Sequence, residues 1–410
     1  MQLVEQHVIR STDGRFAAID AAAFASKNLY NAALYEMRQA FIFGGKWLGY
    51  EELYHRMKDH EAYKALPRKV SQQVLKQLDT AWKGYFAACE AWEADPSKFL
   101  GHPKLPKYKD KQQGRNVLVY TGQALSKTAL KRGELVPSGL PITVKSNQQH
   151  IDQVRIVPRQ GFYVVEVVYE QAIQPAPVSP SLIVSIDIGV NNLAAVTSNK
   201  VGFIPRIVNG RPLKSVNQYY NKRKAELQSL LPREQDWTAR MQRLTDKRTR
   251  RIDHYLHSAS RQIVDVLIEE GIGTLIIGKN PNWKQECVLR KKDKQHFVQL
   301  PHARFVDMLC YKAQLVGIQV VLQEESYTSQ ASFLDGDGIP TYGKVTEEPI
   351  FSGKRIRRGL YRAKSGKCFN ADVNGSYNIL RKASPDAFGK GVEDGLVVHP
   401  VRLVLPGRLA

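Results

Sequence analysis

Residues 182–196 read Leu-Ile-Val-Ser-Ile-Asp-Ile-Gly-Val-Asn-Asn-Leu-Ala-Ala-Val, and this stretch decides the fold. Its first seven residues are apolar apart from Ser185 and Asp187. An apolar run without alternation predicts a strand that is covered on both faces. Gly189 supplies a tight turn, and the Asn-Asn pair tolerates the backbone geometry that follows it. The stretch therefore predicts a buried strand, a turn and a second strand.

The carboxylate in the predicted strand needs an explanation, because a buried charge is costly unless it is paired or holds a metal. Asp187 could instead cap a loop at the strand end. A second acidic motif weakens that alternative, since residues 370–380 read Asn-Ala-Asp-Val-Asn-Gly-Ser-Tyr-Asn-Ile-Leu. Asp372 opens a predicted helix, whose positive amino-terminal end favours the ionised form that a metal ligand requires. The alternative for Asp372 is a helix cap alone.

The composition indicates a nucleic-acid partner. The chain has 410 residues, enough for two or three domains. Lys and Arg number 60 against 39 Asp and Glu, which gives a net charge of +21. Such an excess indicates a polyanion, with nucleic acid as the first choice and an anionic membrane surface as the alternative. No apolar run reaches transmembrane length and no signal peptide opens the sequence, so we expect a soluble cytoplasmic protein.

Cysteine is sparse, and no two cysteines are close enough in sequence for a Cys-x-x-Cys pair. This spacing argues against a disulfide framework and against a zinc site made of four cysteines. We expect small buried hydrophobic side chains at all four positions, which are Cys89, Cys287, Cys310 and Cys368.

The first 170 residues predict strands at both ends of a helical segment. One strand is expected over residues 3–9, and residues 16–95 show apolar residues at helical spacing. Residues 115–170 switch to period-two patterns with Gly- and Pro-rich turns, which predicts a small antiparallel barrel. Aromatic residues within 70–91 could stack on bases, but their spacing favours the core of the helical segment.

The second half predicts a mixed α/β domain. A third strand is expected over residues 202–208, two long helices over 214–270, and further strands over 274–280 and 318–323 around a helix at 301–316. Repeats of strand and helix return each strand in the same direction, so their carboxyl ends meet at one edge. Glu324 and Glu325 follow the last of these strands and would emerge at that edge. Two solvated acids at a strand end are the alternative.

Two motifs carry a resemblance to a known family. Asp187 opens Asp-x-Gly-x-x-Asn-Leu-Ala, and Asp372 opens Asp-x-Asn-x-x-x-Asn-Ile. The two motifs resemble those of the RuvC-type nucleases of the TnpB/OrfB family, which are transposon-encoded and related to type V CRISPR effectors. The likeness runs from the Lys-rich middle to the carboxyl terminus and is weaker over the first 100 or so residues. Asn370 stands where the family's last motif has a first acid.

The resemblance implies a catalytic glutamate that is absent from its usual place. Most relatives end the strand at 274–280 in a metal-binding glutamate, whereas this chain has Gly278-Lys279-Asn280. Some relatives carry the glutamate shifted to a position just before Tyr-Thr-Ser. That pattern implies Glu325 rather than Glu324, because Glu325 has the matching offset from Thr328.

The predicted chemistry is phosphodiester hydrolysis by two Mg²⁺ ions, which take carboxylate oxygens as ligands. The predicted catalytic residues are also the metal ligands: Asp187, Glu325 and Asp372. Asp187 would bridge the ions, and the other two acids would each anchor one.

Three basic segments predict contacts with nucleic-acid phosphates. The first is a Pro-interrupted loop, and the candidates there are Lys104, Lys107, Tyr108 and Lys109. The second lies on the predicted helices, where residues 205–255 hold 13 Lys or Arg against five acids, and its candidates are Lys247, Arg248, Arg250 and Arg251. The third lies in an irregular insertion over residues 330–367, with candidates Lys354, Arg355, Arg357 and Arg358. Solvated charged faces or linkers are the alternatives for each.

The resemblance also implies a division into domains. Residues 1–15 and 100–175 would form a wedge barrel around a helical recognition domain at 16–99. A RuvC/RNase H-like nuclease domain would span 181–327 and 368–390, with a target-nucleic-acid-binding insertion at 328–367. The tail at 391–410 carries no usable signal. The family's insertion is a zinc ribbon, but Ala331-Ser332 stands where its first cysteine pair would begin, so we infer a metal-free loop without zinc.

The implied function is that of an RNA-guided DNA endonuclease. It would bind a transposon-derived guide RNA, one protein per guide, and cut matching double-stranded DNA beside a short flanking motif. Because the usual glutamate is missing, a nuclease-dead RNA-guided repressor on the same fold is the alternative. A transposase that catalyses strand transfer is a third, weaker reading.

Overall fold

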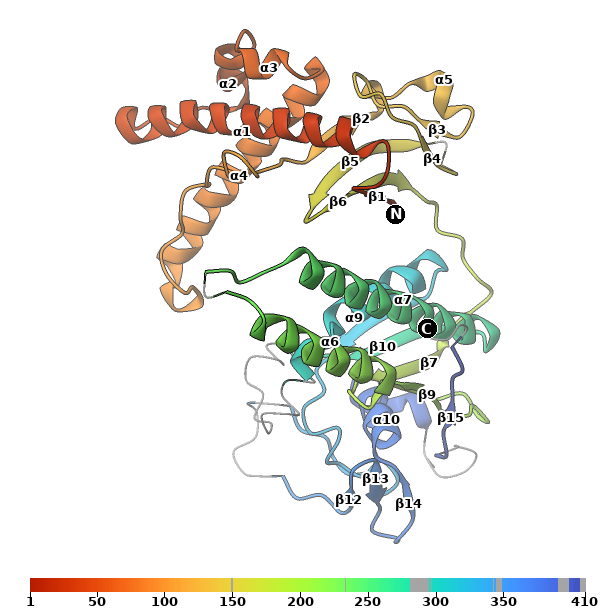
Figure 1. Cartoon of the computed structure of the whole chain (residues 1–410). Helices are drawn as coiled ribbons and strands as arrows, with labels where there is room; N and C mark the ends of the chain where they lie inside the picture. The colour runs from red at the N-terminus through yellow and green to blue at the C-terminus, as the bar shows by residue number, and fades with distance from the viewer. Residues whose placement is uncertain are drawn as a thin grey trace. The chain divides into compact units, whose positions relative to one another are not determined.

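The computed structural model of the chain describes residues 1–148, 150–232, 234–280, 295, 297–341, 343, 349–389 and 398–405. The chain forms two compact units, Met1–Gln171 and Ala172–Ala410 (Figure 1). Within the described ranges, no helix is both long enough and apolar enough to cross a membrane.

The strands of the first unit form an antiparallel sheet. Its described strands, in spatial order, are β1 (Gln2–Arg10), β6 (Phe162–Glu170), β5 (Ile151–Arg159) and β2 (Leu118–Thr121). The predicted small antiparallel barrel is not confirmed, because the described edge strands β1 and β2 of this sheet do not pair with each other. Within the segment 115–170, a separate two-stranded ribbon is formed by β3 (Glu134–Leu135) and β4 (Val144–Lys145).

Helices form the other layer of the first unit, as the apolar spacing predicted. They are α1 (Phe16–Gly44), α2 (Tyr50–Met57), α3 (Glu61–Lys64), α4 (Arg68–Ala94) and α5 (Lys127–Leu130), with 3₁₀ turns at η1 (Pro96–Lys98) and η2 (Gly122–Ala124). Trp82 on α4 is fully buried and meets the ring of Phe41 edge-on, with 5.2 Å between ring centroids. The interpretation of this aromatic side chain as core is therefore confirmed.

The second unit is built on a mixed six-stranded sheet in its described part. The spatial order is β11 (Gln319–Gln323), β10 (Ile272–Gly278), β7 (Ser179–Asp187), β8 (Asn192–Ser198), β9 (Arg206–Asn209) and β15 (Val401–Arg402). Strands β7, β10 and β11 are parallel, and β8 is antiparallel to both β7 and β9. The predicted mixed α/β fold is confirmed, and the carboxyl ends of β7, β10 and β11 meet at one edge.

Helices cover both faces of this sheet. They are α6 (Arg211–Ser229), α7 (Ala239–Glu269), α9 (His302–Leu315) and α10 (Ala371–Ala383), followed by the turn η3 (Pro385–Phe388), and Figure 1 shows α6 and α7 running side by side. Val184 and Ile186 of β7 pack in one core with residues of α7 and α9. Because side chains alternate along a strand, Ser185 and Asp187 face the opposite layer, where α10 packs. The prediction of a strand covered on both faces is confirmed.

The insertion is more regular than the sequence predicted. Its described part contains an antiparallel sheet of β12 (Lys354–Arg357), β13 (Leu360–Arg362) and β14 (Cys368–Asn370), so the prediction of an irregular loop over 330–367 is wrong for this part. The sheet is held by Tyr361 and Phe369, which are buried with their ring centroids 5.7 Å apart. Strands of three or four residues are too short to show a period-two pattern.

Three buried hydroxyl groups attach α10 to the sheet. Ser185 Oγ donates to the carbonyl oxygen of Ser376 at 2.6 Å, and Ser376 Oγ donates to the carbonyl oxygen of Ser185 at 3.0 Å. Thr197 Oγ1 lies 3.0 Å from Ser185 Oγ and 2.8 Å from Ser376 Oγ, so it can donate to either. All three residues are fully buried, and the network lies two residues before Asp187 along β7.

We expect Ser376→Ala to lower the free energy of unfolding by about 1–3 kcal/mol, because it removes one hydroxyl from a buried network whose other members lose a partner. Urea denaturation followed by circular dichroism measures the change. Ser258→Ala on α7 is the matched control, since no hydrogen bond of that helical hydroxyl occurs in the described structure. Equal losses in the two variants would contradict the anchoring role.

Candidate active site

Asp187 lies at the carboxyl end of β7 and faces α10. A Cβ atom added at Gly375 of that helix would come within 2.7 Å of Asp187 Oδ2. Glycine in the middle of a helix costs about 1 kcal/mol relative to alanine. The close approach of the carboxylate explains why this helix carries a glycine there.

Glu325 follows the end of β11 and is held there by its backbone. Its amide nitrogen donates to Asn280 Oδ1 at 3.0 Å. Its carbonyl oxygen accepts from the amide nitrogen and the hydroxyl of Thr328, at 3.2 and 2.8 Å. Tyr327 has a φ of 67°, a left-handed conformation that is uncommon for a residue with a side chain and marks a sharp turn. The chain therefore turns back at the sheet edge directly after this glutamate.

The Glu325 carboxylate occupies the space above Gly278, the last residue of β10. A Cβ atom at Gly278 would overlap with Glu325 Oε2 and would lie 2.6 Å from Ile379 Cδ1. Gly278 pairs with Gln323 of β11, and the preceding residue of β10, Ile277, pairs with Ile186 of β7. The glutamate of the outer strand thus reaches over the end of β10 toward the strand that carries Asp187.

The two neighbouring glutamates have different environments. Glu324 Oε2 forms an ion pair of 2.6 Å with Lys382, whose side chain is only 7% exposed, and Glu324 Oε1 accepts from the amide of Ser326 at 2.6 Å. Burial would raise the pKa of Glu324, but these two contacts hold it below its usual range. Glu325 Oε2 is buried and has no hydrogen-bond partner in the described part of the chain. Glu325 is therefore the acid with an oxygen left for a ligand.

The electrostatics of the site favour a bound cation. Burial raises the pKa of Asp187 well above its ordinary value, the charges of Glu325 and Asp372 raise it further, and Arg355 partly offsets them. Burial also raises the pKa of Glu325 to about 7, with Glu324 adding to the shift and Lys382 opposing it. Acids that repel one another in a buried place are stabilised as carboxylates by a divalent ion.

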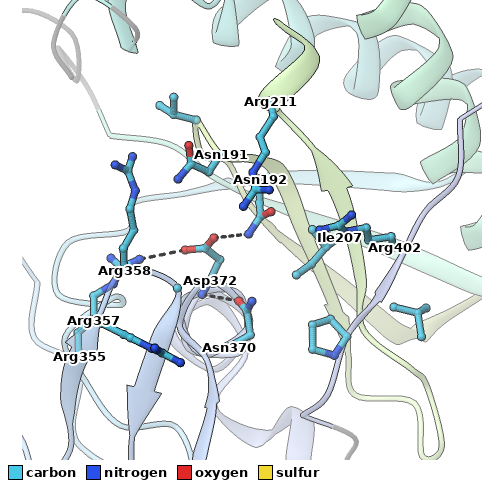
Figure 2. A pocket seen from close by; sticks show the side chains of 15 residues that line it. Asn191, Asn192, Ile207, Arg211, Arg355, Arg357, Arg358, Asn370, Asp372 and Arg402 are labelled. Atoms are coloured by element: carbon cyan, nitrogen blue, oxygen red, sulfur yellow. Dashed lines mark hydrogen bonds and ion pairs between the residues drawn. The ribbon is translucent and has the colours of Figure 1, made fainter. Parts of the chain in front are cut away.

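Asp372 lies in the first turn of α10, and Asn370 caps this helix. Asn370 Oδ1 accepts from the amides of Asp372 and Val373, at 2.9 and 3.2 Å. Asp372 Oδ2 accepts from Asn192 Nδ2 at 2.7 Å, and its Oδ1 lies 3.3 Å from a guanidinium nitrogen of Arg355 (Figure 2). The cap alternative does not account for Asp372, because the neighbouring asparagine supplies the cap and the aspartate side chain points into a pocket.

Two buried asparagines of the last motif hold the segment that follows Glu325. Asn374 Oδ1 accepts from the amide of Phe333 at 3.0 Å, and its Nδ2 donates to the carbonyl oxygen of Ala331 at 2.7 Å. Asn378 Nδ2 donates to the carbonyl oxygens of Thr328 and Ala331, at 2.9 and 2.7 Å. These asparagines were not predicted from the sequence to have a role, although their spacing of four residues places both on one helix face.

The three candidate acids fit a divalent cation chemically but do not form a closed cage. Within the described ranges, no three His, Cys, Asp or Glu side chains lie close enough together to hold an ion. The unpartnered oxygen of Glu325 and the buried carboxyl group of Asp187, whose pKa burial raises, nevertheless suit the carboxylate ligands that Mg²⁺ takes. The donor set is oxygen-only, as a hard cation requires.

The predicted nucleic-acid-binding residues differ in how accessible they are. In the first unit, Lys104, Lys107 and Tyr108 are exposed, while Lys109 is half-buried with its ammonium group 4.9 Å from the centroid of the Tyr30 ring. On α7, Lys247 and Arg250 are exposed and Arg251 is half-buried. All four basic candidates of the insertion, Lys354, Arg355, Arg357 and Arg358, are exposed on or beside β12.

Arg248 already has partners within the protein. Its Nε donates to Asn217 Oδ1 at 2.6 Å, and its guanidinium lies 4.9 Å from the ring centroid of Tyr220. Burial lowers its pKa. The structure therefore gives this arginine a role in joining α6 to α7, and its predicted contact with a phosphate stays a prediction.

A basic pocket of about 870 Å³ lies beside Asp372 (Figure 2). Asn191 and Asn192 line it together with five arginines, which are Arg211, Arg355, Arg357, Arg358 and Arg402. Arg211 and Arg402 are not among the residues that the sequence predicted to bind nucleic acid. They come from the start of α6 and from β15, two segments whose sequence carried no signal of a shared pocket.

Comparisons with known proteins find similar sequences over both motifs of the site. Residues 163–284 match the OrfB family model of IS605 elements, described as probable transposase, and residues 302–379 match a model described as Cas12f1-like, TNB domain. The TnpB-like protein ORF457 of Acidianus two-tailed virus is 25% identical over 395 residues, which cover 87% of this chain and 81% of that protein.

A solved structure shows the same fold. It is the cryo-EM structure of a Cas12f1–sgRNA–target DNA complex, which matches with a TM-score of 0.51 at 15% identity. The match covers 88% of this chain and 82% of that protein. The two motifs, the sheet that brings them together and these comparisons agree: residues 163–284 are similar to the OrfB family of IS605 elements, and the chain as a whole is similar to a TnpB-like protein.

Proposed function

We propose that this protein is an RNA-guided DNA endonuclease of the TnpB type. It binds a transposon-derived guide RNA and cleaves matching DNA beside a short flanking motif, with two divalent metal ions at Asp187, Glu325 and Asp372. The family supports this proposal, as does the structurally similar Cas12f1, whose solved complex contains a guide RNA and a target DNA. The net charge of +21 suits two nucleic-acid partners.

The observation that carries the proposal is the placement of Glu325. A nuclease that had lost its glutamate would have no reason to keep a buried carboxylate oxygen without a partner, since burying an unpaired charge costs free energy. Here that oxygen lies over Gly278, at the end of the strand next to Asp187. This supports an intact set of three acids over a nuclease-dead relative.

Each residue around the acids has a defined task. Asp187, Glu325 and Asp372 would hold the ions, which supply an activated water and charge relief on the leaving oxygen when bound. Asn192 orients Asp372 through the hydrogen bond to Oδ2. The contact of Arg355 with Asp372 is exposed and 3.3 Å long, so this guanidinium can exchange the carboxylate for a DNA phosphate.

We expect Glu325→Gln to lower DNA cleavage by more than about 100-fold, the upper end of what the loss of a residue supporting a metal ligand costs. The measurement is cleavage of matching DNA in Mg²⁺ by protein that carries its guide RNA. Glu324→Gln is the matched control and should cut normally, because Glu324 is bound to Lys382 and Ser326, and the single amide oxygen of glutamine can still accept from Lys382.

The reverse result, in which Glu324→Gln abolishes cleavage and Glu325→Gln does not, would make the assignment wrong by one residue. Wild-type protein that binds the matching DNA but never cuts it would favour the repressor.

We expect Gly278→Ala to reduce cleavage by about 100-fold, because the added methyl group overlaps with the Glu325 carboxylate and a displacement of about 1 Å costs this much. Guide-RNA affinity, measured by filter binding, should not change. Gly84→Ala on α4 is the control, since its added methyl group meets no atom within 4 Å. If Gly278→Ala cleaved DNA as fast as the wild type, the position of the Glu325 carboxylate above Gly278 would not be required for cleavage.

The raised pKa of Glu325 predicts how stability depends on pH without metal. Its pKa is about 7 in the folded protein against an ordinary value of 4.5, so folding favours the protonated form. Its stabilising contribution is complete below pH 4.5 and is lost as the pH rises toward 7. In EDTA at pH 8, Glu325→Gln should therefore unfold at a higher temperature than wild type, with no such gain near pH 4.5.

Added Mg²⁺ should reverse that order. An ion at 100 times its dissociation constant stabilises by about 2.7 kcal/mol, which raises the unfolding temperature of the wild type but not of the variant. Differential scanning calorimetry measures both effects. If Mg²⁺ raised the unfolding temperatures of the wild type and the variant equally, Glu325 would not be a ligand of the ion.

A further inference from the structure

We propose that Arg211 and Arg402 bind phosphates of the DNA strand that is to be cut, and that the carboxy-terminal strand β15 is therefore part of the DNA-binding surface. This inference rests on the proposed function, because it takes Asp372 as part of the cleavage site. It assigns a role to a segment of the tail whose sequence indicated none.

The carboxy-terminal strand brings Arg402 to the pocket. β15 is parallel to β9, with Val401 opposite Arg206 and Arg402 opposite Ile207. The amide of Val401 donates to the carbonyl oxygen of Pro205, and the amide of Leu403 donates to that of Ile207, both at 2.9 Å. These hydrogen bonds hold the backbone on each side of Arg402, so the residue that carries this guanidinium has a fixed position at the edge of the sheet.

Arg211 is held at the start of α6. Its amide donates to Asn209 Oδ1 at 3.1 Å, and the carbonyl oxygen of Asn209 accepts from the hydroxyl of Tyr255 on α7. Gly210 before it is buried against the backbone of Val190, where a Cβ atom would not fit. Because β9 runs directly into this helix, Arg211 and Arg402 are delivered to the pocket by two neighbouring segments.

The charges in the pocket are unbalanced. Asp372 is the only acid in its described lining, against five arginines. In the described part of the chain, Arg211, Arg357 and Arg402 form no ion pair with an acid. Guanidinium groups gathered without counter-charges repel one another, and an anion between them relieves this. The guanidinium fork matches the oxygens of a phosphate.

The arrangement suits a strand that passes Asp372. In Figure 2, Arg211 and Arg402 lie on one side of Asp372, and Arg355, Arg357 and Arg358 lie on the other. The pocket volume of about 870 Å³ is within the ~300–1,000 Å³ of sites that enclose a ligand. A nucleic-acid strand whose phosphates bind the arginines on both sides of the pocket would have the phosphate in between close to Asp372. The bound nucleic acid is therefore the cleaved DNA strand rather than the guide RNA, which must stay intact.

The test compares Arg211→Gln/Arg402→Gln with wild type, using full-length protein purified with its guide RNA. Affinity for a short fluorescent oligodeoxythymidylate is measured by anisotropy in EDTA, over a series of salt concentrations. Loss of two phosphate contacts should make the slope of log affinity against log salt shallower by about 1.4, at about 0.7 per contact on single strands. Arg211→Lys/Arg402→Lys keeps both charges and should recover most of the slope.

Arg362→Gln is the matched control, because this arginine is exposed on β13, outside the pocket lining. Its slope should stay within about 0.7 of wild type, since it can remove at most one contact. An unchanged slope in the double variant would overturn the inference, and so would a loss of guide-RNA affinity in place of DNA affinity. The binding assay needs no cleavage, so its failure is distinguishable from failure of the nuclease proposal.

Where the wild type does cut, KM for a single-stranded substrate in Mg²⁺ gives a second readout. The double variant should raise KM more than it lowers kcat, because it weakens binding of the strand without touching the three acids. A loss confined to kcat would contradict a role in holding the strand.

Discussion

The docking of α10 across β7, β8 and β10 is the constraint on which the site depends. The hydroxyls of Ser185, Thr197 and Ser376 fix the helix to the sheet, with the whole network removed from water. Gly375 lets the helix approach until it meets the Asp187 carboxylate. One packing contact thereby determines where two acids lie, since Asp372 starts the same helix.

The same helix also restrains the third acid, although that acid belongs to a different segment. Asn374 and Asn378 bind the backbone between Thr328 and Phe333, directly after the turn that follows Glu325. A buried amide that loses its partner costs about 1–3 kcal/mol, so this segment cannot shift without a penalty. The motif that supplies Asp372 thus also holds the segment that follows Glu325.

A glutamate that follows β11 can reach the end of β10 because adjacent parallel strands end at the same edge. β10 and β11 are parallel, so the side chain of Glu325, two residues past the end of β11, reaches the space above Gly278 at the end of β10. Burial raises the pKa of the Glu325 carboxyl group to about 7, so the ionised form of this side chain lowers the stability of the fold at neutral pH. A buried carboxylate that lowers the stability of the fold is consistent with a functional requirement for the negative charge of Glu325.

The sequence predicted the parts of the site that depend on strand direction and helix ends. The apolar run before Asp187 and the strand–helix repeats sufficed to place Asp187 and Glu325 at one sheet edge, and the last motif sufficed to start a helix at Asp372. It did not predict β12 to β14, whose strands are too short to show a period. It predicted a small antiparallel barrel in the first unit, where the described strands form an open sheet. The pocket arginines Arg211 and Arg402 were missed because the pairing of β9 with β15 joins segments nearly 200 residues apart.

The central claim is that Glu325 replaces the glutamate missing from β10. A crystal structure of the protein with Mn²⁺ tests it most directly, since anomalous scattering locates the ions independently of the refined side chains. The account predicts manganese with carboxylate oxygens of Asp187, Glu325 and Asp372 as ligands, at about 2.0–2.6 Å as for hard divalent cations. Ions bound by Asp187 and Asp372 while Glu325 stays out of coordination distance would contradict it.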